Sequence, residues 1–185
     1  SALLAEAEHA EAAALYWGVQ DWEGSCMAAE RAMLSYDRTG SDYAATKAKA
    51  LLAAALMETA PTTKATCGAS PQLATESRSE RVRRLLAAAA DFHAKRGEAY
   101  DQALALNDLG LACSMADDFV GAMAALERAL GLFERAGSTL RQAQVLQNIG
   151  WADIGLGRFS RALPRYARAL ALMQPEQDPT LYATM

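Results

Sequence analysis

The chain has 185 residues, a net charge of −4 and a hydrophobic content of 52%, of which aromatic residues make up little. Much of that content is alanine, and alanine, leucine, arginine and glutamate are good helix formers, so the composition predicts an all-helical protein with closely packed helices. The mild negative charge, with both signs interspersed, argues against a nucleic-acid partner. No apolar run approaches the roughly 18 residues needed to span a bilayer, so we expect no membrane partner.

The cysteines and histidines are too few and too scattered to indicate a metal centre. Cys26, Cys67 and Cys113 are odd in number and show no CxxC spacing, which favours a reduced, cytoplasmic protein. His9 and His93 are equally isolated, whereas a zinc site needs several ligands at close spacing. We therefore expect no metal site and no cofactor.

The same pattern of small and large apolar residues occurs three times along the chain. Gly110 aligns with Gly150 across a full unit, which gives a period of 40 residues. The segment Gln20–Gly40 aligns with Asp117–Gly137 at a shift of 97 residues, which is two periods plus 17. Helical hairpins that repeat at such spacing bury both of their apolar faces only by stacking on neighbours. The pattern predicts a helical array in which one unit carries a 17-residue insertion.

The first unit, residues 1–40, is predicted to form two helices on either side of a short turn. Trp22 aligns with Phe119 and is expected in the core, whereas the role of Trp17 stays open. Gly40 stands where the second helix should end, because glycine adopts the left-handed conformation of a helix C-cap without a steric penalty. Ser41 comes next and is expected to cap the next helix, and Gly137 and Ser138 are expected to have the same two roles at the end of the third unit.

The second unit, residues 41–97, contains the insertion. The stretch Ala60–Ser77 has two prolines, one glycine and many hydroxyl residues without an apolar period, which is loop composition. Such a loop could cover the binding surface or contact a neighbouring domain, or it could be a tolerated surface insertion. The run Arg78–Arg84 is interpreted as the solvated first turns of a helix, and Gly97 as the end of that helix.

Residues 98–137 and 138–177 form the third and fourth units, and Asp178–Met185 is expected to begin a further helix. The glycines Gly110 and Gly150 lie where the paired helices would cross, so that large residues can fill the space beside them. The chain stops without the polar capping helix that a solenoid end usually needs, which indicates a fragment of a larger protein.

These residues carry a resemblance to the tetratricopeptide repeat family. The matching positions are Leu109, Gly110, Phe119, Ala122, Leu126 and Ala129, and then Ile149, Gly150, Gly157, Phe159, Ala162, Tyr166 and Ala169. The first helices, LNDLG and LQNIG, resemble those of the longer, 40-residue variety found in kinesin light chains and in bacterial signalling proteins, including those with a caspase-like CHAT protease domain. The resemblance implies an all-α, right-handed superhelical solenoid that acts as a non-enzymatic scaffold and holds a protein or peptide in its concave groove.

Carried over position by position, the resemblance implies a set of residues that line this groove. They are Asn107, Asp108, Leu111 and Ser114 in the third unit and Gln144, Gln147, Asn148 and Trp151 in the fourth. Side-chain amides suit the role because they both donate to and accept from a peptide backbone. The alternatives are that Asn107 and Asn148 bond one repeat to the next or are merely solvated, and that Trp151 packs between repeats.

Two further interpretations compete with the scaffold. The chain could be a ligand-sensing regulatory module beside a catalytic or DNA-binding domain that lies outside it. An enzyme in its own right is disfavoured: Cys113 and His93 could be imagined as a catalytic dyad, but a buried free cysteine is usually inert packing. An exposed end of the array could also support a homodimer.

Overall fold

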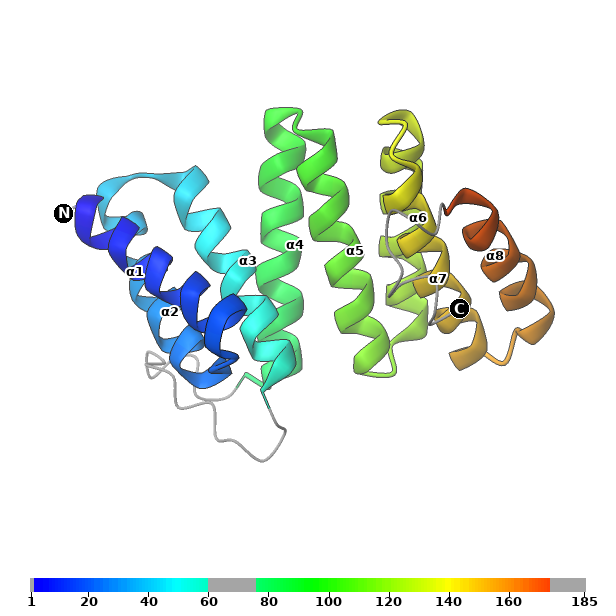
Figure 1. The fold of residues 1–185 in the computed structure, drawn as a ribbon, viewed down its shortest axis with the longest axis horizontal. Helices are drawn as coiled ribbons and strands as arrows, with labels where there is room; N and C mark the ends of the chain where they lie inside the picture. The colour runs from blue at the N-terminus through cyan, green and yellow to red at the C-terminus, as the bar shows by residue number, and fades with distance from the viewer. Residues whose placement is uncertain (1, 60–75, 174–185) are drawn as a thin grey trace. The chain divides into compact units, whose positions relative to one another are not determined.

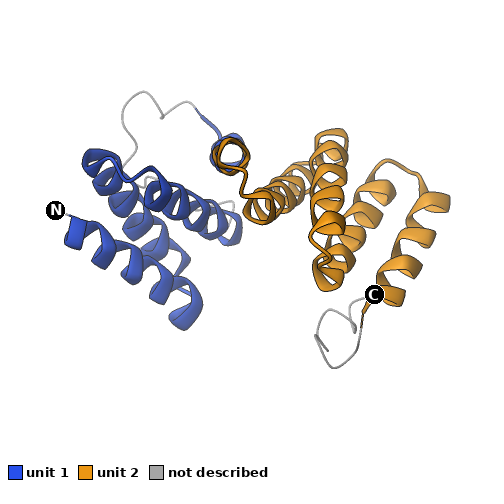
Figure 2. Ribbon diagram, turned by 90° about the horizontal axis from the view of Figure 1, so that it is seen from above, with its two compact units in different colours: residues 1–89 blue, residues 90–185 orange. Residues whose placement is uncertain are grey.

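In a computed structural model of the chain, which describes residues 2–59 and 76–173, all regular elements are helical (Figure 1). They are α1 (Ala2–Ala14), a π-helical turn η1 (Leu15–Val19), α2 (Trp22–Thr39), α3 (Asp42–Glu58), α4 (Arg78–Arg96), α5 (Ala99–Met115), α6 (Phe119–Arg135), α7 (Thr139–Gly155) and α8 (Phe159–Leu172). The chain divides into two compact units, residues 1–89 and 90–185, coloured separately in Figure 2. The division falls inside α4 and therefore does not coincide with a boundary between sequence repeats.

The helices can be placed against the four units expected from the sequence. Each of the four sequence repeats holds two helices, and the predicted insertion falls between the end of α3 at Glu58 and the start of α4 at Arg78. Of the predicted loop, residues 60–75 lie outside the described residues, as does the helix expected to begin at Asp178. None of the helices in the described ranges combines the length and apolar character needed to cross a bilayer.

The turns repeat with the same spacing as the sequence. The glycines Gly40, Gly97 and Gly137, after the second helix of a repeat, adopt positive φ angles of 72°, 72° and 67°. This confirms the prediction that they end their helices, because residues other than glycine rarely adopt that conformation. A second series lies at the turns inside the first, third and fourth hairpins, where Gln20, Asp117 and Gly157 have φ angles of 56°, 58° and 70°.

The predicted serine caps are wrong in their chemistry. Ser41 and Ser138 stand at the N-cap positions of α3 and α7, but neither side chain makes the cap hydrogen bond. The side-chain caps lie instead on the second helices, where the carboxylates of Asp21 and Asp118 each accept from a backbone N–H three residues on, at 2.9 Å. The helices α3 and α7 follow a glycine turn, and the turn itself sets the direction in which they begin. The helices α2 and α6 have an aspartate at the N-cap position, where its carboxylate can accept a backbone hydrogen bond.

In the first compact unit the helices pack through alanine. A cluster of buried residues joins α1, α2 and α3 and consists of Ala5, Ala32, Tyr36, Ala45 and Ala48. Side chains this small allow the helix backbones to approach closely. Larger side chains are buried in the same unit, among them Leu52 and Leu56 of α3 and Leu86 of α4, so alanine contacts and large apolar side chains both contribute to its packing.

The arginine run at the start of α4 makes more contacts with other parts of the protein than the sequence indicates. Arg81 is buried and pairs with the buried Glu30 of α2, and Arg78 donates to the backbone carbonyl of Thr59 at 2.6 Å. Desolvation raises the pKa of Glu30, and the charge of Arg81 opposes that rise. The interpretation of this run as merely solvated is thus wrong for Arg81, because a buried acid on α2 requires a cation opposite.

In the second compact unit, glycine and large residues alternate across the helix contacts. A Cβ atom at Gly110 would lie 2.7 Å from Cδ2 of the buried Leu126, and one at Gly150 would lie 2.7 Å from Cζ of Tyr166. Both contacts join the two helices of one hairpin. Consecutive helices pack on each other along the unit, and α5 also contacts α7. The all-helical fold of packed consecutive hairpins is therefore as predicted.

Candidate functional site

The predicted groove residues lie on α5 and α7, which contact one another in the second compact unit. Asn107 and Leu111 on α5 are half-buried, as are Gln144, Gln147 and Asn148 on α7. On α7 these residues and Trp151 are spaced three or four apart, so that they share one face of the helix. We name the surface formed by the predicted residues on these two helices the α5–α7 face.

A chain of side-chain hydrogen bonds crosses this face. Nδ2 of Asn148 donates to Oδ1 of Asn107 at 2.9 Å, and Nδ2 of Asn107 donates to Oδ1 of Asp108 at 3.2 Å. The first bond joins α7 of the fourth repeat to α5 of the third. The structure therefore realises the inter-repeat bond that the sequence left as an alternative to groove lining, and it does so with residues that keep partial access to solvent.

Asp108 stands out electrostatically on the same face. The residue is exposed, yet desolvation by the surrounding protein raises the pKa of its carboxyl group, against the opposing effects of Asn107 and Arg141. A partial loss of hydration favours pairing of this group with an incoming donor.

Trp151 is 42% exposed. Two further apolar side chains are exposed: Ile154 at the C-terminal end of α7 and Met115 at the C-terminal end of α5. On α7, Nη1 of Arg141 donates to Oε1 of Gln144 at 2.8 Å. The α5–α7 face thus offers amides, a carboxylate and an exposed indole together. This combination can bind a peptide backbone and one apolar side chain.

Ser114 differs from the expectation. Its side chain is buried, and its Oγ has no hydrogen-bond partner among the described residues. A serine side chain extends only a short way from the helix backbone, so neighbouring side chains near the end of α5 cover it. Ser114 therefore does not reach the surface of the α5–α7 face.

Residues 101–174 match the family model of the tetratricopeptide repeat. These residues are tetratricopeptide repeats. All eight predicted groove residues fall inside the matched range. None of the curated proteins compared with the chain matches it.

Tetratricopeptide repeats generally mediate protein–protein interactions and are typically non-catalytic. A match to a fold family does not by itself identify the partner or the segment that is bound. The context of a CHAT protease or a kinesin light chain stays a prediction.

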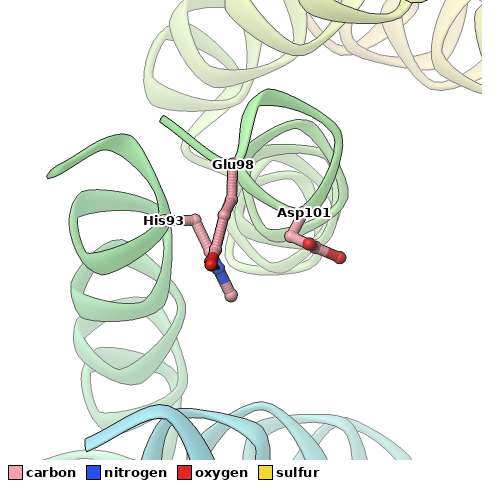
Figure 3. Close-up of side chains that lie close together, drawn as sticks. All are labelled: His93, Glu98 and Asp101. Atoms are coloured by element: carbon pink, nitrogen blue, oxygen red, sulfur yellow. Dashed lines mark hydrogen bonds and ion pairs between the residues drawn. The ribbon is translucent and has the colours of Figure 1, made fainter. Parts of the chain in front are cut away.

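Sequence reasoning missed one polar cluster, at the turn that leads into the tetratricopeptide repeats. The structure brings His93 of α4 together with Glu98 and Asp101 at the start of α5, such that one ligand atom from each lies within 4.8 Å of the others (Figure 3). The available signal was the spacing H-x₄-E-x₂-D across the turn glycine Gly97. The sequence alone does not show that the glycine turn brings the two carboxylates back toward His93, so the isolated histidines predict no metal site.

Proposed function

We propose that the α5–α7 face binds a peptide segment of a partner protein, with the side-chain amides engaging its backbone and Trp151 receiving an apolar side chain. The observation that carries this proposal is the hydrogen bond from Asn148 to Asn107 across two repeats. It holds two amides in fixed orientation at a surface that solvent still reaches. Pre-positioned donors and acceptors reduce the entropy lost when a peptide binds.

The polar groups indicate how the peptide would be held. Each amide has hydrogen-bonding capacity beyond the single bond between them, since a side-chain amide offers two N–H donors and an acceptor oxygen. Asp108 would accept from a backbone N–H or a basic side chain, and its partial desolvation strengthens such a bond. The preferred ligand is therefore a peptide that carries a basic group near an apolar residue.

The apolar part of the proposal rests on Trp151. An indole that is 42% exposed, on a helix that also exposes Ile154, offers an apolar surface next to the amides. Tryptophan is among the residues that most often dominate binding energies at interfaces. We expect an aliphatic or aromatic peptide side chain to cover it.

The test is selection of binding peptides from a random display library on the full chain, followed by fluorescence polarisation with the selected peptides. Trp151→Ala and Asn148→Ala should each weaken binding by about tenfold or more, a loss of at least about 1.4 kcal/mol. The matched control is Trp17→Ala, because Trp17 is 78% exposed on η1 in the other compact unit and belongs to no part of the face.

Two outcomes of this selection would contradict the proposal. Peptides whose affinity is unchanged by Trp151→Ala and Asn148→Ala but lost in Trp17→Ala would assign binding to the first compact unit. If no peptide is enriched, the α5–α7 face is not a peptide site.

A further inference from the structure

We propose that His93, Glu98 and Asp101 form a binding site for a divalent transition-metal ion of the zinc type. The site joins the last turn of α4 to the first turn of α5, at the entrance to the tetratricopeptide repeats. It is separate from the α5–α7 face and does not depend on peptide binding there.

The geometry of the three side chains is already close to that of a coordination site. Nδ1 of His93 lies 2.8 Å from Oε2 of Glu98, and Asp101 stands three residues further along, on the first turn of α5 (Figure 3). Ligand atoms at about 2.0–2.1 Å from a tetrahedral ion lie about 3.3 Å from each other. Ligand atoms within 4.8 Å of one another reach that arrangement through small side-chain rotations.

The backbone fixes the positions from which these side chains start. Gly97 adopts a φ of +72°, and the N–H of Glu98 donates to the carbonyl oxygen of His93 at 3.0 Å. This hydrogen bond is typical of a helix that ends at a glycine in the left-handed conformation. His93 and Glu98 are therefore held opposite one another by the turn itself, independently of the groups that their side chains bind.

The rest of the chain shows what this turn needs for folding alone. At the turns of Gly40 and Gly137, the residue equivalent to His93 is Tyr36 or Phe133, and both are buried. The same backbone hydrogen bond closes each turn, at 3.1 Å in both. A buried aromatic side chain thus satisfies the packing at this position, and a histidine adds a nitrogen ligand that the packing does not require.

The two carboxylates depart from the repeat in the same way. Serine stands at the position of Glu98 in both other turns, as Ser41 and Ser138, and the position of Asp101 is occupied by Arg141 in the fourth repeat. Three ligand-type residues have therefore replaced non-ligand residues around a single turn. Departures from a local structural rule that gather at one place are expected at functional sites.

The donor set selects the class of ion. One imidazole nitrogen and two carboxylate oxygens suit zinc and its neighbours, whereas Ca²⁺ and Mg²⁺ prefer oxygen ligands alone. Nε of Arg96 donates to Oε1 of Glu98 at 2.7 Å, which leaves Oε2 directed at His93. A hydrogen-bonded carboxylate ligand of this kind is commonly oriented by such a partner.

The experiment is a calorimetric titration of ZnCl₂ into the chelator-treated full chain. We expect one saturable site, and about tenfold or greater loss of affinity in His93→Phe and in Asp101→Asn. His93→Phe introduces the residue that stands at the equivalent position in the third repeat, so it should fold. The matched control is His9→Gln, which removes the other histidine and should leave zinc affinity unchanged.

Two further readouts separate a metal site from a structural ion pair. Co²⁺ added to the wild-type chain should give visible absorption bands that His93→Phe lacks, and excess Ca²⁺ should not displace the Co²⁺. Zinc should raise the melting temperature of the wild type but not of Asp101→Asn, because an ion that binds the folded state stabilises it. The proposal is overturned if no saturable zinc binding occurs, or if affinity is the same in His93→Phe, Asp101→Asn and the wild type.

Discussion

The helices α6 and α8 carry the same apolar skeleton, 40 residues apart, but bury it to different extents. Leu130 on α6 is 7% exposed, and its equivalent on α8, Leu170, is 37% exposed. Phe119 begins α6 with its ring against Gly155 of α7, so close that a Cβ atom at Gly155 would overlap it. Phe159 begins α8 in the same way and is 67% exposed.

The difference lies in the next helix along the chain. The helix after α6 is α7, which covers the outer apolar surface of α6, whereas α8 is the last helix among the described residues. The same side chain is therefore core in one repeat and surface in the next. In a repeat array a residue's burial depends on its neighbouring repeat as much as on its own sequence.

The contact inside a hairpin should be the most sensitive to change, since it exists in both repeats. Gly110→Val places a branched side chain against Leu126 and the backbone carbonyl of Ala122. We expect a loss of about 2–3 kcal/mol in unfolding free energy, which is typical of overpacking in a closed helix contact. Urea denaturation monitored by circular dichroism measures it.

Gly131→Ala on α6 is the control for this substitution. A Cβ atom at Gly131 meets only the end of Arg135, at 3.7 Å, so the change should stabilise the helix by up to about 1 kcal/mol. Equal effects of the two substitutions would show that helix propensity, and not the crossing at Gly110, determines these glycines.

The second prediction concerns the contact between repeats. Phe119→Ala should lower the unfolding free energy by about 2 kcal/mol, because it removes a ring that packs on the following repeat. Phe159→Ala should cost less than about 0.5 kcal/mol, as expected for an exposed position. Parallel denaturant titrations of the two variants compare them, and similar losses would mean that α8 is covered in solution.

The contrast between α6 and α8 also separates the features that the sequence could predict from those that depend on packing. The all-helical fold and the glycine turns were predictable because they depend on local chemistry that recurs along the chain, as at Gly40. The burial of Ser114 and the pairing of Arg81 with Glu30 were not, because they depend on which side chains the packing brings together. The groove residues follow from the family resemblance and stay a prediction, while the hydrogen bond between Asn148 and Asn107 was one of several open alternatives.

The helix caps provide a third, smaller test of the same pair of helices. Asp118 caps α6 by accepting from the N–H of Gly121 at 2.9 Å, whereas Arg158 stands at the corresponding position of α8 and makes no side-chain cap. Asp118→Ala should therefore cost about 1 kcal/mol. Arg158→Asp should gain roughly 0.5–1 kcal/mol by adding the missing cap and a negative charge at the helix N-terminus. Thermal melts of both variants check the opposite signs.

The smallest expected effect tests whether the two repeats are coupled through the α5–α7 face. The bond from Asn148 to Asn107 lies at a partly solvated surface, so its net contribution should be only about 0.5–1 kcal/mol. A double-mutant cycle with Asn107→Ala, Asn148→Ala and both together isolates that value from the effect of each substitution alone. The same cycle run on the affinity for a selected peptide should give a larger coupling than the cycle run on stability, because a bound peptide would use both amides at once. Equal coupling in the two cycles would make this bond a structural link between repeats and would remove the amides from the proposed binding surface.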